Sequence, residues 1–322
     1  LNGLTSNYGD QYRGEIITDA DGNCYIASCT TSPSFPVTDG AYQETYGGGP
    51  QDGVVFSLNP ELSDLRWSTY VGGASGEGAL GLRLDSDENV YFSGVCSDEF
   101  IAMSGYQPGY LGGTRDAFVM RLIDEGTTVS ASSYWGSAGT DAAFFLDIDN
   151  DGNVYLYGQS TGGSEVTPDV YSNPGSQQFI CSLSPDLADL NLGTVVGAGG
   201  ANFIPIAFMV DACGYIYFSG HGASGALPLV DPLYATGGFY LGVLTPNAED
   251  LEFSTLYSGN HVDGGTSRFD PDQGIVYQSV CISGGFTTTP DAYSTTSPSW
   301  DVGVFKIDFG ISHVNAAAAA EP

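Results

Sequence analysis

One acidic turn has the residue spacing of a calcium-binding loop. The segment Asp147-Ile-Asp149-Asn-Asp151-Gly152 matches the D-x-D-x-D-G start of such a loop, in which carboxylates at alternate positions converge on one cation. The ninth and twelfth positions, Tyr155 and Gly158, supply no carboxylate. Calcium at Asp147, Asp149 and Asp151 is therefore one hypothesis, and calcium is the only cofactor that the sequence suggests. The alternative is a hydrogen-bonded hairpin, because two of these aspartates occupy positions that recur in other turns of the chain.

A second set of polar residues recurs before the turns. Each member is an acid or an amide seven to nine residues ahead of a turn aspartate, and the set is Asp10, Glu77, Asp141, Asn202 and Asp263. If the strand that follows lines a central channel, these side chains form a polar ring at one mouth of it and hold a cation or another ligand. Clustered carboxylates repel unless a cation or shared protons intervene, so raised pKa values or a bound ion would support this hypothesis. The alternative is that each side chain caps its own glycine-rich loop.

Residues suited to catalysis are few. The three histidines, His221, His261 and His313, lie in unrelated contexts, and the G-x-S-x-G, H-E-x-x-H and sialidase-type Asp-box motifs are missing. His261, Asp263 and Arg268 form one mixed polar cluster, in which His261 and Arg268 are candidate binding residues. A buried Asp263–Arg268 pair that braces the loop is the favoured interpretation. Because the chain has 38 acidic residues, a glycosidase pair of carboxylates cannot be singled out. We predict that the protein is not an enzyme.

The charge balance limits the partners. The chain has 38 acidic and 7 basic residues, for a net charge of −31. Such a surface repels nucleic acid and anionic lipid, so neither is an expected partner. No stretch reaches the roughly 18 apolar residues of a membrane helix, so we expect no direct membrane insertion. Solubility in salty surroundings and cation binding are the two interpretations of the acidity.

The cysteines and the first residues say little about the compartment. The six cysteines are scattered and include no C-x-x-C pair of the kind that binds zinc. Disulfides and buried free thiols are both open interpretations of an even number of cysteines. The first five residues have the composition of a loop rich in glycine and asparagine, and they lack the features of a signal peptide.

An internal repeat of about 60 residues organises the whole chain. An aspartate, a turn and a tyrosine-containing strand recur five times, with turn aspartates at Asp19, Asp85, Asp149, Asp211 and Asp270. The matching tyrosines, Tyr25, Tyr91, Tyr155, Tyr217 and Tyr277, are 66, 64, 62 and 60 residues apart. This regularity predicts five copies of one structural unit.

Each unit contains strand signals in a fixed order. In the first unit they are 15–18, 24–27, 53–58 and 65–70, and the D-x-D-G-N turn between the first two is typical of a compact hairpin. No window shows convincing helical periodicity. A lone four-stranded sheet exposes both faces, whereas stacking it between two neighbours buries both. The sequence therefore predicts an all-β fold, a β-propeller of four-stranded antiparallel blades.

Five blades are predicted, and the number needed to close the ring is a separate question. The units span 8–70, 71–134, 135–195, 196–256 and 257–311, with an N-terminal segment at 1–7 and a linker toward a following domain at 312–322. The fifth unit ends after its third strand. A closed five-blade ring would need residues 1–7 as the last strand, and their composition is poor for a strand. We favour five blades of a larger ring, with the closed five-blade ring as the alternative.

The units resemble the bacterial seven-bladed β-propeller (SBBP) repeat, with consensus elements D-x-x-G-N-x-Y, S-x-x-F-P, D-x-F-V-x-K-L and S-T-Y-x-G-G. The likeness covers about residues 8–311 and depends on Asp19–Tyr25, Ser34–Pro36, Ser68–Gly73 and Asp116–Val119. Two further segments, Tyr8–Ile16 and His261–Asp270, resemble the propeller region of large gliding-motility-associated cell-surface proteins of Bacteroidota.

This resemblance implies a context as well as a fold. In that family a seven-bladed propeller is one part of a long chain exported by type IX secretion, so an extracellular, cell-surface location is implied. Other domains of the same chain, or other surface proteins, are the implied partners. The chain departs from the family after Cys281, where Ile282-Ser-Gly-Gly285 replaces a second cysteine, and this puts a local disulfide in doubt.

Two functional hypotheses follow. The first is a non-enzymatic structural or adhesion module of a secreted surface protein. The second is a carbohydrate-binding or carbohydrate-active propeller, a lectin, glycosidase or lyase, with glycans as partners. Tyrosines recur in the long loops before the third strands, at Tyr42, Tyr106, Tyr110, Tyr171, Tyr234 and Tyr293. Such regularity favours packing over a binding site that is unique to one blade.

Overall fold

The computed structural model describes residues 14–100, 104–197, 203–222, 227–258, 267–270, 275–282, 288–296 and 301–308. These residues form nineteen strands and one short 3-10 helix, η2 (Pro246–Ala248). The first two sheets, blades 1 and 2, each have four antiparallel strands in sequence order. Blade 1 contains β1 (Glu15–Thr18), β2 (Cys24–Thr30), β3 (Asp52–Leu58) and β4 (Leu65–Val71). Blade 2 contains β5 (Glu77–Leu84), β6 (Val90–Cys96), β7 (Asp116–Ile123) and β8 (Thr128–Trp135).

The next two sheets repeat this order, and the last has three described strands. Blade 3 contains β9 (Asp141–Ile148), β10 (Val154–Ser160), β11 (Gln178–Leu183) and β12 (Leu190–Val196). Blade 4 contains β13 (Ile204–Val210), β14 (Ile216–His221), β15 (Phe239–Leu244) and β16 (Leu251–Tyr257). Blade 5 contains β17 (Ser267–Asp270), β18 (Ile275–Ile282) and β19 (Asp301–Asp308). Each sheet is thus formed by one repeat unit of the sequence.

The hairpin between the first two strands is built in the same way in successive blades. In blade 1, Asp19 Oδ1 accepts hydrogen bonds from the amides of Asp21 and Asn23, at 3.0 and 2.8 Å. Asp85 and Asp149 accept the equivalent bonds in blades 2 and 3. The third residue after each aspartate has positive φ, at Gly22 (86°), Glu88 (61°), Gly152 (82°) and Gly214 (85°). The predicted turn is confirmed, since the aspartate bonds its own backbone and glycine supplies the left-handed conformation in three of four blades.

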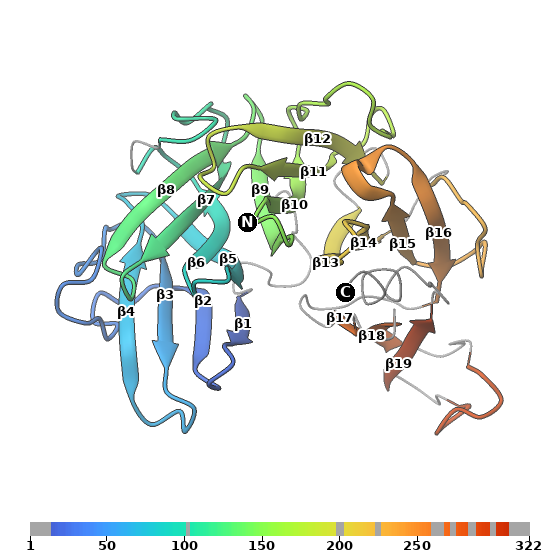
Figure 1. Ribbon diagram of the computed structural model, residues 1–322, viewed down its shortest axis with the longest axis horizontal. Helices are drawn as coiled ribbons and strands as arrows, with labels where there is room; N and C mark the ends of the chain where they lie inside the picture. The colour runs from blue at the N-terminus through green and yellow to red at the C-terminus, as the bar shows by residue number, and fades with distance from the viewer. Residues whose placement is uncertain are drawn as a thin grey trace, which may run out of the picture.

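The blades are arranged as in a β-propeller. Figure 1 shows the five sheets along an arc, with β1, β5, β9, β13 and β17 toward the centre and β4, β8, β12 and β16 at the rim. The inner strand of each blade contacts that of the next, from β1 with β5 to β13 with β17. The predicted fold class is therefore confirmed. The prediction that seven blades close the ring stays a prediction.

One position on the third strand of each blade forms the contact with the following blade. The strand registers align Val55, Val119, Ile180, Leu241 and Val304 at this position. The first four are at most 3% exposed, and each packs within a core cluster that includes side chains of the next blade. Val304 is 70% exposed, and Val302 on the same face is 64% exposed. Blades 1 to 4 bury this face of the sheet against the next blade, whereas in blade 5 the same face is exposed.

The loop tyrosines join neighbouring blades. The backbone amides of Tyr42, Tyr106 and Tyr171 donate to carbonyls in the outer hairpin of the following blade. The acceptors are Gly126, Leu187 and Ala248, at 3.0, 2.7 and 2.7 Å. All three acceptor residues have positive φ. The side chains of Tyr42, Tyr106 and Tyr171 also pack against the core, as does that of Tyr110, which agrees with the predicted packing role. Tyr234 and Tyr293 are exposed, so the prediction does not hold for them.

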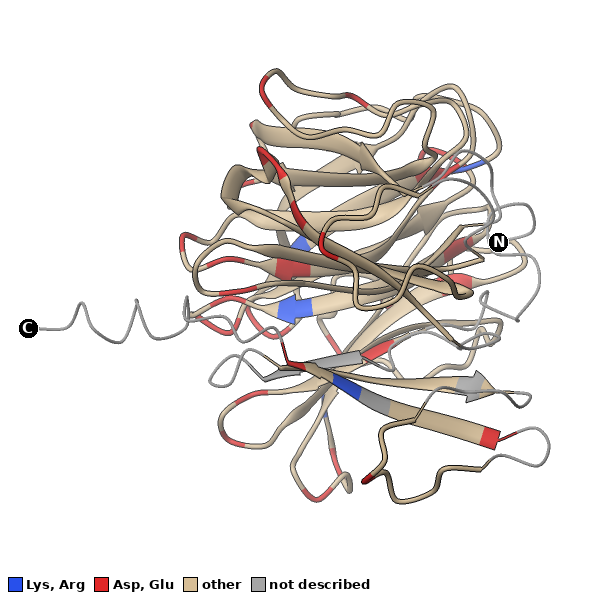
Figure 2. Ribbon diagram, turned by 90° about the vertical axis from the view of Figure 1, so that its right-hand side faces the viewer, with Lys and Arg blue, Asp and Glu red and all other residues tan. Residues whose placement is uncertain are grey.

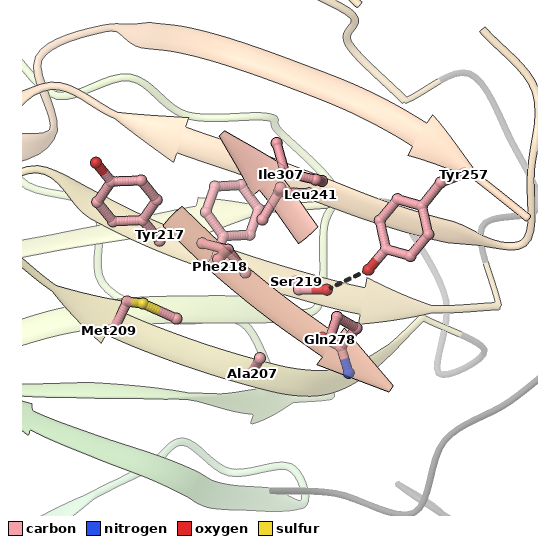
Figure 3. A pocket seen from close by; sticks show the side chains of 10 residues that line it. Ala207, Met209, Tyr217, Phe218, Ser219, Leu241, Tyr257, Gln278 and Ile307 are labelled. Atoms are coloured by element: carbon pink, nitrogen blue, oxygen red, sulfur yellow. Dashed lines mark hydrogen bonds between the residues drawn. The ribbon is translucent and has the colours of Figure 1, made fainter. Parts of the chain in front are cut away.

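Two further details concern the core. Cys96 and Cys181 are completely buried and form no disulfide. A cavity of about 10 Å³ lies between blades 4 and 5, where Ala207, Met209 and Gln278 line it beneath the hydrogen bond between Ser219 Oγ and Tyr257 Oη (Figure 3). Its size suits at most one water molecule, so we regard it as a packing defect of this interface and not as a binding site.

We predict that a Val→Ala substitution lowers stability at one of two equivalent positions and has almost no effect at the other. Val119→Ala should lower the free energy of unfolding by about 2 kcal/mol, because it opens a cavity between blades 2 and 3. Val304→Ala should change it by less than about 0.5 kcal/mol, because Val304 is mostly exposed. Urea denaturation of the two variants at several protein concentrations measures both. Equal losses at every concentration would show that Val304 is covered within a single chain.

Candidate functional site

In the turn with calcium-like spacing, the Asp149 carboxylate forms hydrogen bonds within the turn itself. Asp149 Oδ1 accepts the amides of Asp151 and Asn153, and its Oδ2 accepts the Asn153 side-chain amide at 2.9 Å. Asp147 lies in β9, where its Oδ1 is 3.0 Å from Arg83 Nε and its Oδ2 accepts the Val210 amide at 2.8 Å. Asp147, Asp149 and Asp151 therefore do not converge. Within the described parts of the chain, no group of three or more histidine, cysteine, aspartate or glutamate side chains is arranged to hold a metal ion.

Asp147 belongs to an ion-pair network that connects the inner strands. Arg83 on β5 pairs with Asp147 on β9, and its Nη1 is 3.5 Å from Glu15 Oε1 on β1. Since Asp147 also accepts the Val210 amide of β13, the network links blades 1 to 4. In Figure 2 few ribbon segments are blue (Lys and Arg), whereas red segments (Asp and Glu) are frequent. One of these rare cations is therefore used to hold the inner strands together.

We predict that Asp149→Ala destabilises the protein through loss of the hairpin cap. Two backbone amides and one side-chain amide lose their acceptor, so the free energy of unfolding should fall by about 1 to 3 kcal/mol. Asp151→Ala is the matched control, because the Asp151 side chain is exposed, and it should change stability by less than about 0.5 kcal/mol. Urea denaturation with and without a calcium chelator provides the measurement. A chelator-dependent loss of stability in the parent chain that is smaller in both variants would instead point to calcium at this turn.

The members of the polar ring that the structure describes are Glu77 and Asp141, the first residues of β5 and β9. Both side chains are completely buried. Glu77 Oε2 accepts the Gly73 amide at 2.9 Å and Asp141 Oδ2 accepts the Ser137 amide at 2.8 Å, so each caps its own glycine-rich loop. A solvent-facing ring at a channel mouth is wrong for these two residues, because their carboxylates face the interfaces between blades.

Most of the other predicted ring and cluster residues are outside the part of the chain that the structure describes. Asp10, Asn202, Asp263 and His261 are outside the described residues, and Arg268 is a residue of β17. The strand registers align Phe203 with Glu77 and Asp141, and not the preceding residue Asn202, which the sequence analysis had placed at this position.

Each buried acid has a partner that the sequence analysis missed. Asp52 begins β3 and Asp116 begins β7, and both are completely buried. A Cβ on Gly72 would lie 2.9 Å from both Asp52 Cγ and Glu77 Oε2, so these two carboxylates meet beside this glycine. At the next interface a Cβ on Gly136 would lie 2.8 Å from Asp116 Cγ, and Asp141 is close enough to raise the pKa of Asp116. The recurrence of aspartate as the first residue of the third strand, at Asp52, Asp116 and Asp301, was the available signal.

Burial changes the acidity of these pairs. It raises the pKa of Glu77 to about 7, and the nearby Asp52 carboxylate adds to the rise. Burial likewise raises the pKa of Asp116 to about 7, with a further contribution from Asp141. The pKa values of Asp52 and Asp141 are also raised, mainly by burial. These shifts are the expected behaviour of like charges that share a site with little water.

The interface between blades 3 and 4 has no such acid pair. Gln177 stands where Asp52 and Asp116 stand, and Phe203 replaces the acid on the inner strand. The side-chain amides of Gln159 and Gln178 both donate to the Phe203 carbonyl, at 2.7 and 2.8 Å. Neutral groups therefore fill the position that acids fill at the two preceding interfaces.

An acidic cleft of about 810 Å³ lies where blades 3 and 4 meet. Its walls include the two turn hairpins, β12 and η2, and five carboxylates: Asp149, Asp151, Asp169, Asp211 and Glu249. Several asparagine side chains complete the polar lining, among them Asn150, Asn191 and Asn247. Two of the carboxylates, Asp149 and Asp211, already cap their own hairpins. The rest of the lining offers hydrogen-bonding groups to a polar ligand.

The comparisons with known proteins are sparse. No protein-family model and no curated protein sequence matches the chain. Among solved structures, a luciferin-regenerating enzyme matches with a TM-score of 0.30 and 14% identity over 67% of this chain and 56% of its own. A D477G ACO/RPE65 chimera matches with a TM-score of 0.37 and 10% identity over 88% of this chain and 52% of its own. The chain thus spans about half the length of these proteins, and likenesses this distant support no functional argument.

The buried acids predict an unusual pH dependence. Because Glu77 and Asp116 titrate near pH 7 in the folded chain but near their ordinary values of 4.5 and 3.8 when unfolded, the folded state binds more protons between about pH 4 and 7. The free energy of unfolding should therefore fall as pH rises through this window, by about 1.4 kcal/mol per pH unit for each such proton. The effect should be present in buffers free of divalent cations.

Glu77→Gln and Asp116→Asn should each flatten this slope, because the amides do not titrate. Glu61→Gln, a change at an exposed position, is the control and should leave the slope unchanged. Urea denaturation of the four proteins at pH 5, 6, 7 and 8 measures the effect. Parallel pH profiles for all four would show that the buried acids keep their ordinary acidity.

Proposed function

We propose that this protein is a non-enzymatic structural or adhesion module, a propeller within a longer, extracellular bacterial surface protein. The observation on which the proposal rests is that the repeated polar residues perform the same intramolecular task in blade after blade. The turn aspartates cap hairpins, the loop tyrosines join blades, and Glu77 and Asp141 cap the loops before the inner strands. Repetition of this kind supports a rigid scaffold, since a catalytic site would require side chains specific to one place.

The exposed face of blade 5 supports a partner of matching architecture. Val304 occupies a position that is buried in the four earlier blades, and Ile16 on β1 is 55% exposed at the other end of the arc. Each of these surfaces suits another β-sheet of the same kind, from the same chain or from another surface protein. The resemblance to the seven-bladed repeat of gliding-motility-associated proteins supports the first source, and with it secretion by the type IX route. No described helix has the length and apolar character needed to cross a membrane.

A second candidate function is carbohydrate binding. The cleft between blades 3 and 4 favours it, because carboxylate and amide side chains such as Asp169 and Asn247 line a space that could hold several sugar units. Such groups pair with the hydroxyls of a glycan.

A glycan array combined with a polysaccharide hydrolysis assay separates the candidates. We expect no hydrolysis, and no array signal that is lost in Asp169→Ala or Asn247→Ala. An array signal abolished by these variants without hydrolysis would establish the lectin function. Hydrolysis of any polysaccharide by the purified protein, absent from an identically purified blank, would contradict the non-enzymatic proposal.

A further inference from the structure

The two acid pairs carry negative charge that the surrounding protein does not neutralise. Asp52, Glu77, Asp116 and Asp141 are each 0% exposed, and no ion pair between described residues includes any of them. Arg115, which precedes Asp116, is in none of these ion pairs, and its buried Nη1 has no hydrogen-bond partner. Burying an uncompensated carboxylate is costly, so groups of this kind are normally paired or coordinate a metal.

Each pair also has oxygen atoms with unused acceptor capacity. Asp52 Oδ2 accepts the Gly47 amide at 2.6 Å and Glu77 Oε2 accepts the Gly73 amide, whereas Asp52 Oδ1 and Glu77 Oε1 are buried without any hydrogen-bond partner. In the second pair, Asp116 Oδ2 accepts the Leu111 amide at 2.5 Å and Asp116 Oδ1 is unpartnered, whereas both Asp141 oxygens accept hydrogen bonds from Ser137. One oxygen of each of the Asp52, Glu77 and Asp116 side chains is therefore fixed by backbone while the other is left for something else.

The loops whose amides bind the first pair are closely packed against each other. The loops before β3 and β5 are so closely packed that a Cβ on Gly47 would lie 2.5 Å from the Gly73 carbonyl oxygen and 2.7 Å from that of Gly72. Only glycine fits there. At the second interface Gly113 contacts the Gly139 carbonyl in the same manner. The donor atoms that the two carboxylates offer are all oxygen, which hard cations prefer.

At the first three interfaces the acids occur together or not at all. Both positions are acidic at the interfaces between blades 1 and 2 and between blades 2 and 3, and at the third interface both are replaced, by Gln177 and Phe203. If each acid only capped a loop, its replacement would not need to coincide with that of its partner. Joint replacement is expected when the two carboxylates act as one site.

We propose that each pair binds one calcium ion, with Asp52 and Glu77 as ligands at the first interface and Asp116 and Asp141 at the second. A divalent cation balances two carboxylates, whereas a monovalent ion would leave one charge uncompensated. Zinc is disfavoured because the donors are all oxygen, and magnesium because it retains several waters of its own, for which a completely buried site has little space. The bound ion joins the third strand of one blade to the inner strand of the next. This inference goes beyond the proposed function, since it assigns a ligand that would hold the blades together.

The test is the number of calcium ions bound per chain. The full chain is stripped with a chelator, dialysed, and titrated with calcium chloride by calorimetry, with ⁴⁵Ca equilibrium dialysis as a second measurement. We expect two ions per chain and a melting temperature that rises by several degrees on saturation. Magnesium chloride at the same concentration should give a smaller rise.

Isosteric amide variants assign the sites. Asp52→Asn with Glu77→Gln should reduce the number of ions to one, and adding Asp116→Asn with Asp141→Asn should reduce it to zero. The control is Asp149→Asn with Asp151→Asn, which alters the calcium-like turn and should leave two ions bound. Since the third interface functions with neutral groups, we expect the pair variants to fold, and near-UV circular dichroism in chelator checks this.

The results that overturn the proposal are specific. Absence of calcium binding by the stripped parent chain would do so, and shared protons would then be the means by which the pairs are neutralised. An unchanged number of ions in the quadruple amide variant would also overturn it, as would loss of both ions in the turn control. If a pair variant fails to fold, the parent chain's number of bound ions and its calcium-dependent melting temperature still decide the question.

Discussion

Everything in this structure depends on the packing of one blade against the next. A four-stranded sheet with two apolar faces is stable only when both are covered, and the propeller covers them with neighbouring sheets. Val55, Val119, Ile180 and Leu241 perform this role in four successive blades, each from the same point on the third strand. Each of these blades therefore depends on its neighbour for burial, whereas Val302 and Val304 on blade 5 are exposed.

The close approach of the blades also explains the polar features between them. The loops before the third strand of one blade and the inner strand of the next must interlock, and glycine is required because any side chain would strike the opposite backbone. Polar groups that cap these loops are then removed from water. In this way a requirement of packing produces the pairs Asp52–Glu77 and Asp116–Asp141, and with them the raised pKa values of Glu77 and Asp116.

Three of the few basic residues of this strongly acidic chain pair with acids at particular places in the fold. With 7 basic residues in the whole chain, the placement of each cation matters. Arg83 joins Glu15 and Asp147 across the inner strands, and Arg66 and Arg121 lie over Tyr25 and Tyr91 beside the hairpins of blades 1 and 2. These three arginines neutralise acids at the hairpins and along the inner strands, but they do not reach the acids between the blades.

The sequence by itself determined the repeat, the strands, the Asp-capped hairpins and the propeller class, because these depend on short-range patterns that recur about every 60 residues. It also singled out Glu77 and Asp141 by their position before the inner strands. Only the tertiary structure decided what these acids meet. Asp52 and Glu77 belong to different blades. Asp147 pairs with Arg83, which is 64 residues away in the sequence, and not with a metal ion in the neighbouring turn. Contacts between blades depend on how the sheets stack in space. A local sequence pattern therefore does not predict which side chain of the neighbouring blade a residue will contact.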